Sequence, residues 1–345
     1  MTEIGSDKPI RTAVIGLGLA GSVFHAPAIA ADPAYQLSAI VTADPGRRAK
    51  ALAAYPGTAV LDSFQQLPFG ELDLVVLGTP PLSHAPLARE AIDRGLSVVV
   101  DKPFAPSSAE GLELIEYARR AGKLLTVYQN RRWDGEFLTL QRLLEQNTLG
   151  EVYRFESRME RWAPTISKDW KTQAQPGVGI LFDLGTHLID QALLLFGPVD
   201  QVYGELDARR RQEPSDDDVF LALRHSSGVR SHLSMNVSVA QFAPRLRVLG
   251  SEAGYLKELG DLQEAQILAG VLPGQPGYGV DPEANWGRLG REGNNRLVPT
   301  ERGDFPSFYR LLAESLNDGT PPPVDPVDAV AALRIIEEVR AQNGL

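Results

Sequence analysis

The 345-residue chain contains no cysteine, only five histidines and only three methionines. The absence of cysteine excludes disulfides, thiolate nucleophiles and metal sites with cysteine ligands. Because histidine is also scarce, we expect no bound metal.

The chain also lacks an excess of basic residues and any long apolar run. It has 34 basic and 44 acidic residues, a net charge of −10, which argues against nucleic acids and anionic membranes as partners. No stretch could span a bilayer, and residues 1–9 do not resemble a signal peptide. These features predict a cytoplasmic protein. A chain of this length is expected to form two domains.

The most informative stretch is glycine-rich. The pattern predicts a buried strand over residues 12–15 and a helix over 22–31, joined by a G-x-G-x-x-G turn. Gly16 allows the sharp turn, Gly18 lets a pyrophosphate approach the backbone, and Gly21 lets helix and strand pack closely. The N–H groups at the helix start attract phosphates. In this context the turn predicts a dinucleotide site.

The next strand, predicted over residues 36–42, indicates which dinucleotide is bound. An acidic residue at its end would hold the ribose of NAD, but Thr42 occupies that place. Asp44 is predicted to cap the following helix instead. Thr42, with Arg47 and Arg48 nearby, favours the 2′-phosphate of NADP. The alternative is that both arginines lie on a solvated helix face.

Two further strands, predicted over residues 72–77 and 96–101, end in residues suited to a ligand site. Ligands meet the carboxyl ends of parallel strands, so the turns after these strands should line the cofactor groove. His84 could contact the cofactor or be only a polar residue early in a helix. A cis bond is possible before Pro103. The other predicted cofactor contacts in the turns are Leu19, Ala20, Thr79, Pro80 and Lys102.

Strands and helices alternate up to Tyr128, which predicts a doubly wound parallel sheet, a Rossmann-type α/β domain, over residues 1–128. The later strand-like runs and a hairpin signal at residues 226–228 predict an α+β domain with a mostly antiparallel sheet over residues 129–345.

Two polar segments of the second domain have their own predictions. The charge runs Arg209–Arg211 and Asp216–Asp218 are interpreted as a solvated strand connection. Residues 270–303, rich in Gly, Pro and Asn, are predicted to form a long loop, which would be functional or part of an interface.

A predicted buried helix over residues 182–196 carries titratable side chains. Asp183, His187 and Asp190 have the spacing of one helix face. Histidine is a natural general base near neutral pH, and buried titratable groups near a cofactor are candidates for catalysis. The alternative is a hydrogen-bonded core histidine.

Four motifs in order along the chain resemble the glucose–fructose oxidoreductase/inositol dehydrogenase (Gfo/Idh/MocA) family. They are Gly16–Gly21, Thr79-Pro80 with His84, Asp101-Lys102-Pro103, and Asp183-x-Gly-x-His187-x-x-Asp190. The resemblance implies that Lys102, Asp183 and His187 are catalytic. Two departures are Asp101, where the family usually has Glu, and Pro81, which replaces an Asn and loses an amide contact to the cofactor.

Residues 24–27 and 129–135 look closest to the NADP-preferring scyllo-inositol dehydrogenases of that family. This similarity implies NADP as cofactor, with NAD possible, and a polyol or sugar substrate. It also implies reversible hydride transfer to nicotinamide. The implied substrate-binding residues are Lys102, Arg132, Trp133, Asp183 and His187.

Each catalytic residue has an implied role. His187 would take the hydroxyl proton, and Lys102 would stabilise charge on the same oxygen. Asp183 would hold a neighbouring hydroxyl or tune His187. The alternatives are another sugar dehydrogenase, a nucleotide-dependent glycosidase, an imine reductase and a non-catalytic nucleotide sensor.

The second sheet predicts an assembly. The strand over residues 218–225 has apolar residues on both faces, although an antiparallel sheet can leave one face to solvent. The family typically pairs these sheets between subunits, so the resemblance implies a homodimer or a homotetramer. Alternatively, the loop over residues 270–303 covers the open face.

Overall fold

The computed structural model describes residues 8–165, 177–210 and 215–345. The chain forms two compact units. Unit 1 comprises Met1–Asn130, Gln263–Tyr278 and Phe305–Val330, and unit 2 comprises Arg131–Leu262, Gly279–Asp304 and Ala331–Leu345. The expected division at residue 128 placed everything after it in the second domain, but two later segments pack within unit 1.

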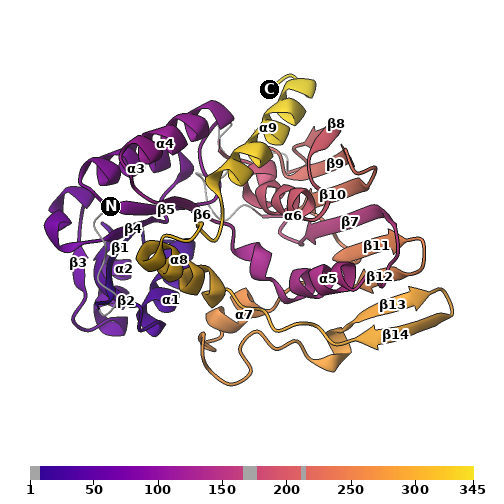
Figure 1. Cartoon of the computed structure of the whole chain (residues 1–345), viewed down its shortest axis with the longest axis horizontal. Helices are drawn as coiled ribbons and strands as arrows, with labels where there is room; N and C mark the ends of the chain where they lie inside the picture. The colour runs from indigo at the N-terminus through magenta and orange to yellow at the C-terminus, as the bar shows by residue number, and fades with distance from the viewer. Residues whose placement is uncertain (1–7, 166–176, 211–214) are drawn as a thin grey trace. The chain divides into compact units, whose positions relative to one another are not determined.

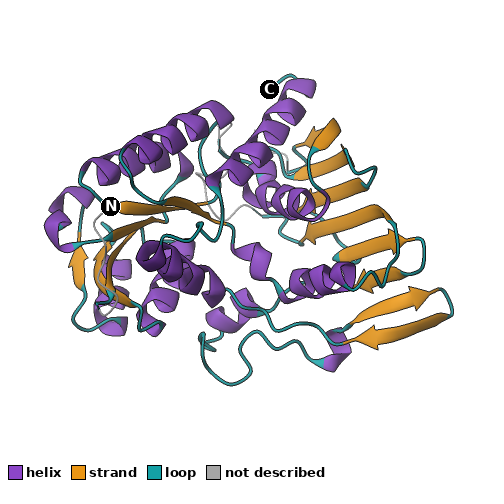
Figure 2. Cartoon of the chain, in the orientation of Figure 1, coloured by secondary structure: helices purple, strands orange, loops and turns teal. Residues whose placement is uncertain are grey.

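Unit 1 is built on a six-stranded parallel sheet of order β3-β2-β1-β4-β5-β6 (Figures 1 and 2). This order confirms the predicted doubly wound sheet. The short strand β3 was not predicted, because only one of its three residues, Val60, is buried. The strands are β1 (Ile10–Ile15), β2 (Tyr35–Val41), β3 (Ala59–Leu61), β4 (Leu74–Leu77), β5 (Ser97–Asp101) and β6 (Leu125–Tyr128).

Helices flank this sheet, with α3 and α4 along one face and α1 and α8 along the other (Figure 1). Asp44 caps α2 as predicted, accepting the Arg47 backbone N–H at 2.8 Å. Ser107 caps α4 in the same way. The helices are the π-helical turn η1 (Ala20–His25), α1 (Ala26–Ala31), α2 (Pro45–Ala54), η2 (Phe64–Gln66), η3 (Phe69–Glu71), η4 (Pro81–Ser83), α3 (His84–Asp93), α4 (Ser108–Arg120), α7 (Gln263–Leu268) and α8 (Pro306–Asp318).

A buried aromatic cluster attaches α8 to the first two strand–helix units. The Tyr309 hydroxyl lies 2.7 Å from Nδ1 of His25, and the Tyr35 hydroxyl donates to the Tyr309 carbonyl at 2.6 Å. Tyr128 packs edge-on against both His25 and Phe308, with ring centroids 4.4 and 4.8 Å apart. These contacts explain why the segment that begins at residue 305 belongs to unit 1.

Unit 2 contains an eight-stranded sheet of order β14-β13-β12-β11-β7-β10-β9-β8. Only the β7–β10 pair is parallel, which confirms the predicted, mostly antiparallel sheet. The strands are β7 (Val152–Glu160), β8 (Val199–Asp207), β9 (Asp218–His225), β10 (Arg230–Asn236), β11 (Leu246–Gly250), β12 (Gly254–Lys257), β13 (Gly287–Arg291) and β14 (Asn294–Val298).

The helical segments of unit 2 cover one face of this sheet (Figure 2). They are α5 (Gly135–Glu145), the π-helical turn η7 (Leu181–Gly185) and α6 (Thr186–Phe196), whereas the short turn η8 (Glu283–Asn285) lies just before β13. The short turn η5 (Asn130–Trp133) and the last helix α9 (Pro326–Gln342) each include the point where the two units divide. Among the described residues, no helix is long and apolar enough to cross a membrane.

The hairpin between β9 and β10 is confirmed, with Gly228 at a φ of +91°. The prediction of a loop throughout residues 270–303 was wrong. Residues 287–298 form the β13–β14 hairpin, which extends the sheet beyond β12. The hairpin has few buried apolar side chains, chiefly Leu289 and Val298, so its sequence resembles a loop. It does not cover the open face of the sheet.

The prediction of a solvated connection beside β9 was wrong for Asp216 and Asp217, whereas Arg209 is exposed as predicted. Asp217 is fully buried and accepts the backbone N–H groups of Arg209 and Arg210 at 2.7 and 2.9 Å. The preceding residue, Asp216, is only 9% exposed. Arg211, which completes the predicted basic run, lies outside the described residues.

Candidate active site

The glycine-rich turn in unit 1 has the geometry of a phosphate cradle. Gly16 has a φ of +89°, and a Cβ there would lie 2.7 Å from the Gly78 carbonyl oxygen. A Cβ at Gly21 would lie 2.0 Å from the Gly16 oxygen, so no larger residue fits. A Cβ at Gly18 would meet nothing within 4 Å. Gly18 therefore leaves the backbone approachable, as the pyrophosphate of a dinucleotide requires.

The helix that follows this turn starts as the π-helical turn η1 rather than as an α-helix. Such turns are rare and frequent at functional sites. Leu19 and Ala20 stand at its beginning, and Leu19 is 47% exposed. These two residues are thus accessible to a ligand, and their role in cofactor binding stays a prediction.

The ends of β4 and β5 present the predicted strand-end residues side by side in unit 1, because these strands pair in parallel. Thr79 and Pro80 follow β4, and the Ser83 hydroxyl donates to the Thr79 hydroxyl at 2.7 Å. Lys102 follows β5, and its backbone N–H is bonded to the Asp101 carboxylate at 2.9 Å. The Lys102–Pro103 peptide is cis, as the sequence allowed.

His84 is 1% exposed and contacts both of these turns. Its Nε2 lies 2.8 Å from the Thr79 carbonyl oxygen, and its Nδ1 lies 3.0 Å from the Pro103 carbonyl oxygen. Burial lowers the pKa of His84, although hydrogen bonds to backbone carbonyls act in the opposite direction. Its ring nitrogens face the backbone, and a direct cofactor contact stays a prediction.

The two arginines that follow β2, Arg47 and Arg48, have different surroundings. Thr42 is buried, and its N–H donates to the Leu61 carbonyl at 2.9 Å. Arg48 forms an ion pair with Asp62 at 2.5 Å. Arg47 is exposed on the first turn of α2 and has no ion-pair partner among the described residues. Arg47 is therefore the better placed of the two to meet a phosphate.

In unit 2, Asp183 and His187 lie on one continuous helical run. Asp183 belongs to the π-helical turn η7 and His187 to the first turn of α6. His187 is 4% exposed and Asp190 is 2% exposed, whereas Asp183 is partly exposed. A Cβ at Gly185 would lie 3.3 Å from the Met235 side chain, so the glycine between Asp183 and His187 allows close packing on β10.

Asp216 caps the start of this helical run, and sequence analysis missed it. Its carboxylate accepts the Leu181 N–H at 2.7 Å, and its backbone carbonyl accepts the Ile180 N–H at 3.0 Å. Gly179, at a φ of +106°, makes room, because a Cβ there would lie 2.1 Å from the Asp216 carboxylate. Burial raises the pKa of Asp216, against the effect of its hydrogen bonds.

Two adjacent residues of α6 fasten it to the segment that contains Arg131 and Arg132. The Arg132 guanidinium makes two hydrogen bonds to Asp190, at 2.8 and 2.6 Å. The Gln191 amide donates to the Arg131 carbonyl at 2.8 Å. A bidentate arginine–carboxylate pair fixes geometry strongly. Arg132 thus braces α6, while substrate contacts by Arg132 and Trp133 stay predictions.

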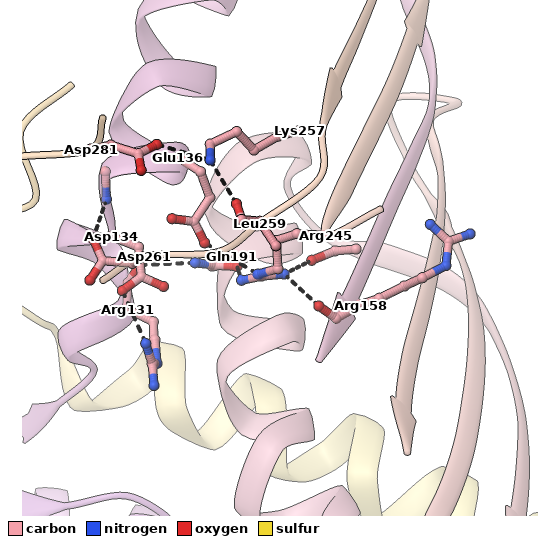
Figure 3. Close-up of polar contacts among 12 residues, drawn as sticks. Arg131, Asp134, Glu136, Arg158, Gln191, Arg245, Lys257, Leu259, Asp261 and Asp281 are labelled. Carbon is pink, nitrogen blue, oxygen red and sulfur yellow. Dashed lines mark hydrogen bonds and ion pairs between the residues drawn. The ribbon is translucent and has the colours of Figure 1, made fainter. Parts of the chain in front are cut away.

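The Arg245 side chain connects three elements of unit 2, which are α5, α6 and β7 (Figure 3). Its guanidinium lies 3.2 Å from Glu136 at the start of α5 and donates to the Ser157 hydroxyl at 2.6 Å. It also reaches the Gln191 side-chain oxygen at 3.4 Å. Burial raises the pKa of Glu136, and the charge on Arg245 opposes this rise. The network holds α6 against the sheet through charged groups that are almost fully buried.

A second buried cation lies beside this network. Lys257 is 1% exposed and forms an ion pair with Asp281 at 3.0 Å (Figure 3). Its ammonium also donates to the carbonyls of Leu259 and Asn285 at 2.8 and 2.7 Å. These three contacts hold the Lys257 ammonium within the structure, and Lys257 has no role in the predicted chemistry.

The predicted site residues fall into two groups. The glycine-rich turn, Thr79, Pro80, His84 and Lys102 share the carboxyl ends of the strands of unit 1, and Asp183, His187 and Arg132 share one helix and its brace in unit 2. The first group fits a dinucleotide. The second group presents a carboxylate and an imidazole, which suit proton transfer and hydroxyl binding.

Two family models match the chain over most of its length. Residues 10–129 match the model described as an oxidoreductase family with an NAD-binding Rossmann fold. Residues 137–256 match the model described as the GFO/IDH/MocA C-terminal domain.

Individual proteins are similar over almost the whole chain. The uncharacterized oxidoreductase YdgJ of Escherichia coli (strain K12) is 36% identical over 95% of this chain and 94% of its own length. The scyllo-inositol 2-dehydrogenase (NADP(+)) IolW of Bacillus subtilis (strain 168) is 30% identical over 95% of this chain and 92% of its own. The solved structure of the candidate oxidoreductase yvaA from Bacillus subtilis superposes with a TM-score of 0.91 at 30% identity, covering 98% of this chain and 97% of that one.

The glycines of the turn allow packing and ligand approach to be tested separately. Gly21→Ala should destabilise the fold by about 1–3 kcal/mol, because its methyl group overlaps the Gly16 oxygen. Gly18→Ala should leave the melting temperature of the ligand-free protein close to wild type, yet weaken NADPH binding about tenfold or more, equivalent to about 1.4 kcal/mol.

Fluorescence titration with NADPH and thermal denaturation measure these two effects. Gly70→Ala is the control, because a Cβ there also meets nothing within 4 Å but lies outside the turn. Unchanged NADPH affinity in Gly18→Ala would contradict the assignment of this turn to the cofactor.

The cap at Asp216 is tested by a pair of substitutions. Asp216→Ala removes the acceptor for the Leu181 N–H and should cost about 1 kcal/mol, the usual value of a lost cap. Asp216→Asn keeps an oxygen acceptor and should recover most of this loss in thermal denaturation. An equal loss in both variants would show that the cap is not the reason for the stability of this segment.

Proposed function

Because the chain belongs to the Gfo/Idh/MocA family of NAD(P)-binding oxidoreductases, we propose that it is an NADP-dependent dehydrogenase of polyols or sugars. We further propose scyllo-inositol as its substrate. One observation carries this choice: Lys102, Asp183 and His187 are all present in a chain that is 30% identical to a scyllo-inositol 2-dehydrogenase (NADP(+)) over 95% of its length.

The proposed reaction interconverts a CH–OH group and a ketone. A bound nicotinamide supplies the hydride chemistry. In the oxidation direction the His187 imidazole accepts the proton of the reacting hydroxyl, and in reduction it returns that proton. The Lys102 ammonium donates a hydrogen bond to the same oxygen and stabilises its negative charge. Asp183 accepts a hydrogen bond from a neighbouring hydroxyl and so orients the ring.

The residues that would hold the cofactor come from unit 1. The turn from Gly16 to Gly21 would take the pyrophosphate, and Thr42 with Arg47 would take the 2′-phosphate. The turns after β4 and β5 would line the rest of the cofactor site, since ligands bind at the carboxyl ends of parallel strands.

A substrate screen tests the proposed function. Purified protein is incubated with scyllo-inositol, myo-inositol and a panel of aldoses, each with NADP and with NAD, while nicotinamide absorbance is followed. We expect the highest kcat/KM for scyllo-inositol with NADP. Turnover of an aldose alone would indicate that the substrate is an aldose and not scyllo-inositol. Turnover of no tested compound would favour a nucleotide sensor. Release of an aglycone from a glycoside would indicate a glycosidase.

Two substitutions test the catalytic roles. Lys102→Ala and His187→Ala should each lower kcat by about a hundredfold or more, the size typical of positioned acid–base groups. Lys123→Ala serves as the control, because Lys123 lies at the opposite, amino-terminal end of β6. Steady-state rates and thermal denaturation are measured together. Near-normal turnover in His187→Ala would exclude the proposed general base.

The cofactor preference is tested through the two arginines of α2. NADP should be preferred to NAD in kcat/KM, and Arg47→Ala should reduce that preference by about 1.5–3 kcal/mol, the value of a lost hydrogen bond to a charged group. Arg48→Ala should change it less, because Arg48 already pairs with Asp62. A clear preference for NAD would instead indicate that Asp44 meets the ribose.

We also propose that the open face of the sheet in unit 2 pairs with a second copy of the chain. The side chains of one row of residues that crosses the strands point to this face. Their neighbours along each strand, such as Leu221, Leu233 and Val248, point to the opposite face and are fully buried. The row mixes apolar and charged side chains, and Tyr203 at one end is 54% exposed. It consists of Tyr203, Ala222, His232, Glu156, Arg247, Leu256, Arg288 and Leu297.

The composition of this face also suits a two-fold pairing, because the carboxylate at its centre is already paired within the chain. Glu156 at the centre of the row forms ion pairs with Arg158 and Arg247 at 2.8 and 2.9 Å. Arginine and aromatic side chains are enriched at protein interfaces. The same patch on two copies can be self-complementary about a two-fold axis.

Light scattering at micromolar concentration tests this assembly. Wild-type protein should have the mass of a dimer or tetramer, and Ala222→Arg should shift it toward the monomer, because a buried unpaired charge at an interface is costly. Ala49→Arg on the exposed face of α2 is the matched control. A monomeric wild-type protein would refute the pairing of sheets.

A further inference from the structure

His84 is placed between two turns that each carry a predicted site residue. His84 is the first residue of helix α3, and its Nε2 lies 2.8 Å from the Thr79 carbonyl oxygen. On the other side, Nδ1 lies 3.0 Å from the carbonyl oxygen of Pro103, the residue directly after Lys102. All of these residues belong to unit 1.

The chemistry of the ring limits what His84 can do. Carbonyl oxygens accept hydrogen bonds, so each ring nitrogen faces an acceptor. A neutral imidazole has one N–H and can donate to one carbonyl, and an imidazolium can donate to both. In either form both nitrogens are directed at the backbone. The side chain is therefore not arranged as a general base or as a donor to a phosphate.

The ring is also rigid and almost fully buried, with an exposed fraction of 1%. It therefore sets the separation between the Thr79 carbonyl and the Pro103 carbonyl, which follow neighbouring strands. We propose that His84 is a positioning residue: it clamps the turn of Lys102 to the turn of Thr79 and so fixes the backbone from which the Lys102 side chain extends. The catalytic consequence rests on the proposed function of Lys102, whereas the clamp itself does not.

The first experiment examines the clamp without cofactor or substrate. Hydrogen–deuterium exchange of residues 78–83 and 101–106 is compared between wild type, His84→Phe and His84→Gln. His84→Phe keeps a flat ring but has no donor, and His84→Gln keeps one N–H donor. We expect faster exchange in both segments in His84→Phe, and partial recovery in His84→Gln.

A matched control separates this effect from the general loss of a buried histidine. His225 is also 1% exposed, and its ring nitrogens lie 2.8 Å from the Gly197 carbonyl and 2.8 Å from the Ser231 hydroxyl. His225→Phe should leave exchange in the two segments of unit 1 unchanged. Unchanged exchange in His84→Phe, or an equal increase in His225→Phe, would overturn the clamp.

The second experiment asks whether the clamp acts through Lys102. His84→Phe should lower kcat with scyllo-inositol and NADP by about tenfold to a hundredfold, as expected for a misplaced catalytic group, with a smaller change in KM. In a Lys102→Ala background, the same substitution should lower kcat by less than about twofold, because coupled residues are not additive. His84→Gln should restore part of the rate.

The outcomes separate the two proposals. Faster exchange in His84→Phe together with no turnover of any tested substrate by wild type would support the clamp and contradict the proposed function. Additive losses in the double variant would overturn the action of His84 through Lys102. NADPH binding, measured by fluorescence, should weaken in His84→Phe, because the Thr79 turn also loses its contact.

Discussion

Unit 1 depends on one constraint, which is that the start of η1 packs directly against the backbone of the glycine-rich turn before it. At Gly21 even a methyl group would lie 2.0 Å from the Gly16 oxygen. This approach brings β1, its turn and η1 together, and Gly16 in turn lies against the end of β4 at Gly78. Because backbone meets backbone at these positions, a ligand can reach main-chain N–H groups that side chains would otherwise cover.

In unit 2 the candidate site residues lie on a helix rather than on turns. Asp183 and His187 need a fixed helix, and three kinds of contact fix it. Asp216 caps its start, the Arg132 guanidinium forms a bidentate pair with Asp190, and the Gln191 amide donates to the Arg131 carbonyl. The π-helical turns η1 and η7 each stand at the beginning of a helix with predicted site residues, where local irregularity is frequent.

The sequence predicted the features whose causes are local. Glycine spacing at Gly16–Gly21, the cap at Asp44 and the alternating strands are all set by nearby residues. The role of Asp216 was not predictable in this way, because its partner Leu181 lies 35 residues earlier along the chain. A run of three aspartates indicates solvent exposure, and only the fold shows that two of them cap and brace buried backbone.

The same distinction applies to His84 and to the β13–β14 hairpin. Sequence alone left His84 as a cofactor contact or a polar helix residue, and the contact to Pro103 joins residues 19 positions apart. The hairpin was not predicted because few of its side chains are buried, and because β14, at the edge of the sheet, pairs only with β13. Spacing therefore selected the candidate site residues, whereas the partners that hold them in place could be identified only from the tertiary structure.

The proposed function requires direct transfer of hydrogen between a substrate carbon and a nicotinamide that unit 1 would hold. The decisive measurement uses scyllo-inositol that carries deuterium on its hydroxyl-bearing carbons, with NADP and the wild-type protein. If hydride transfer is direct, deuterium will appear in the recovered NADPH, and the rate will fall relative to unlabelled substrate. Reduced cofactor without deuterium, or release of the label to water, would contradict direct transfer.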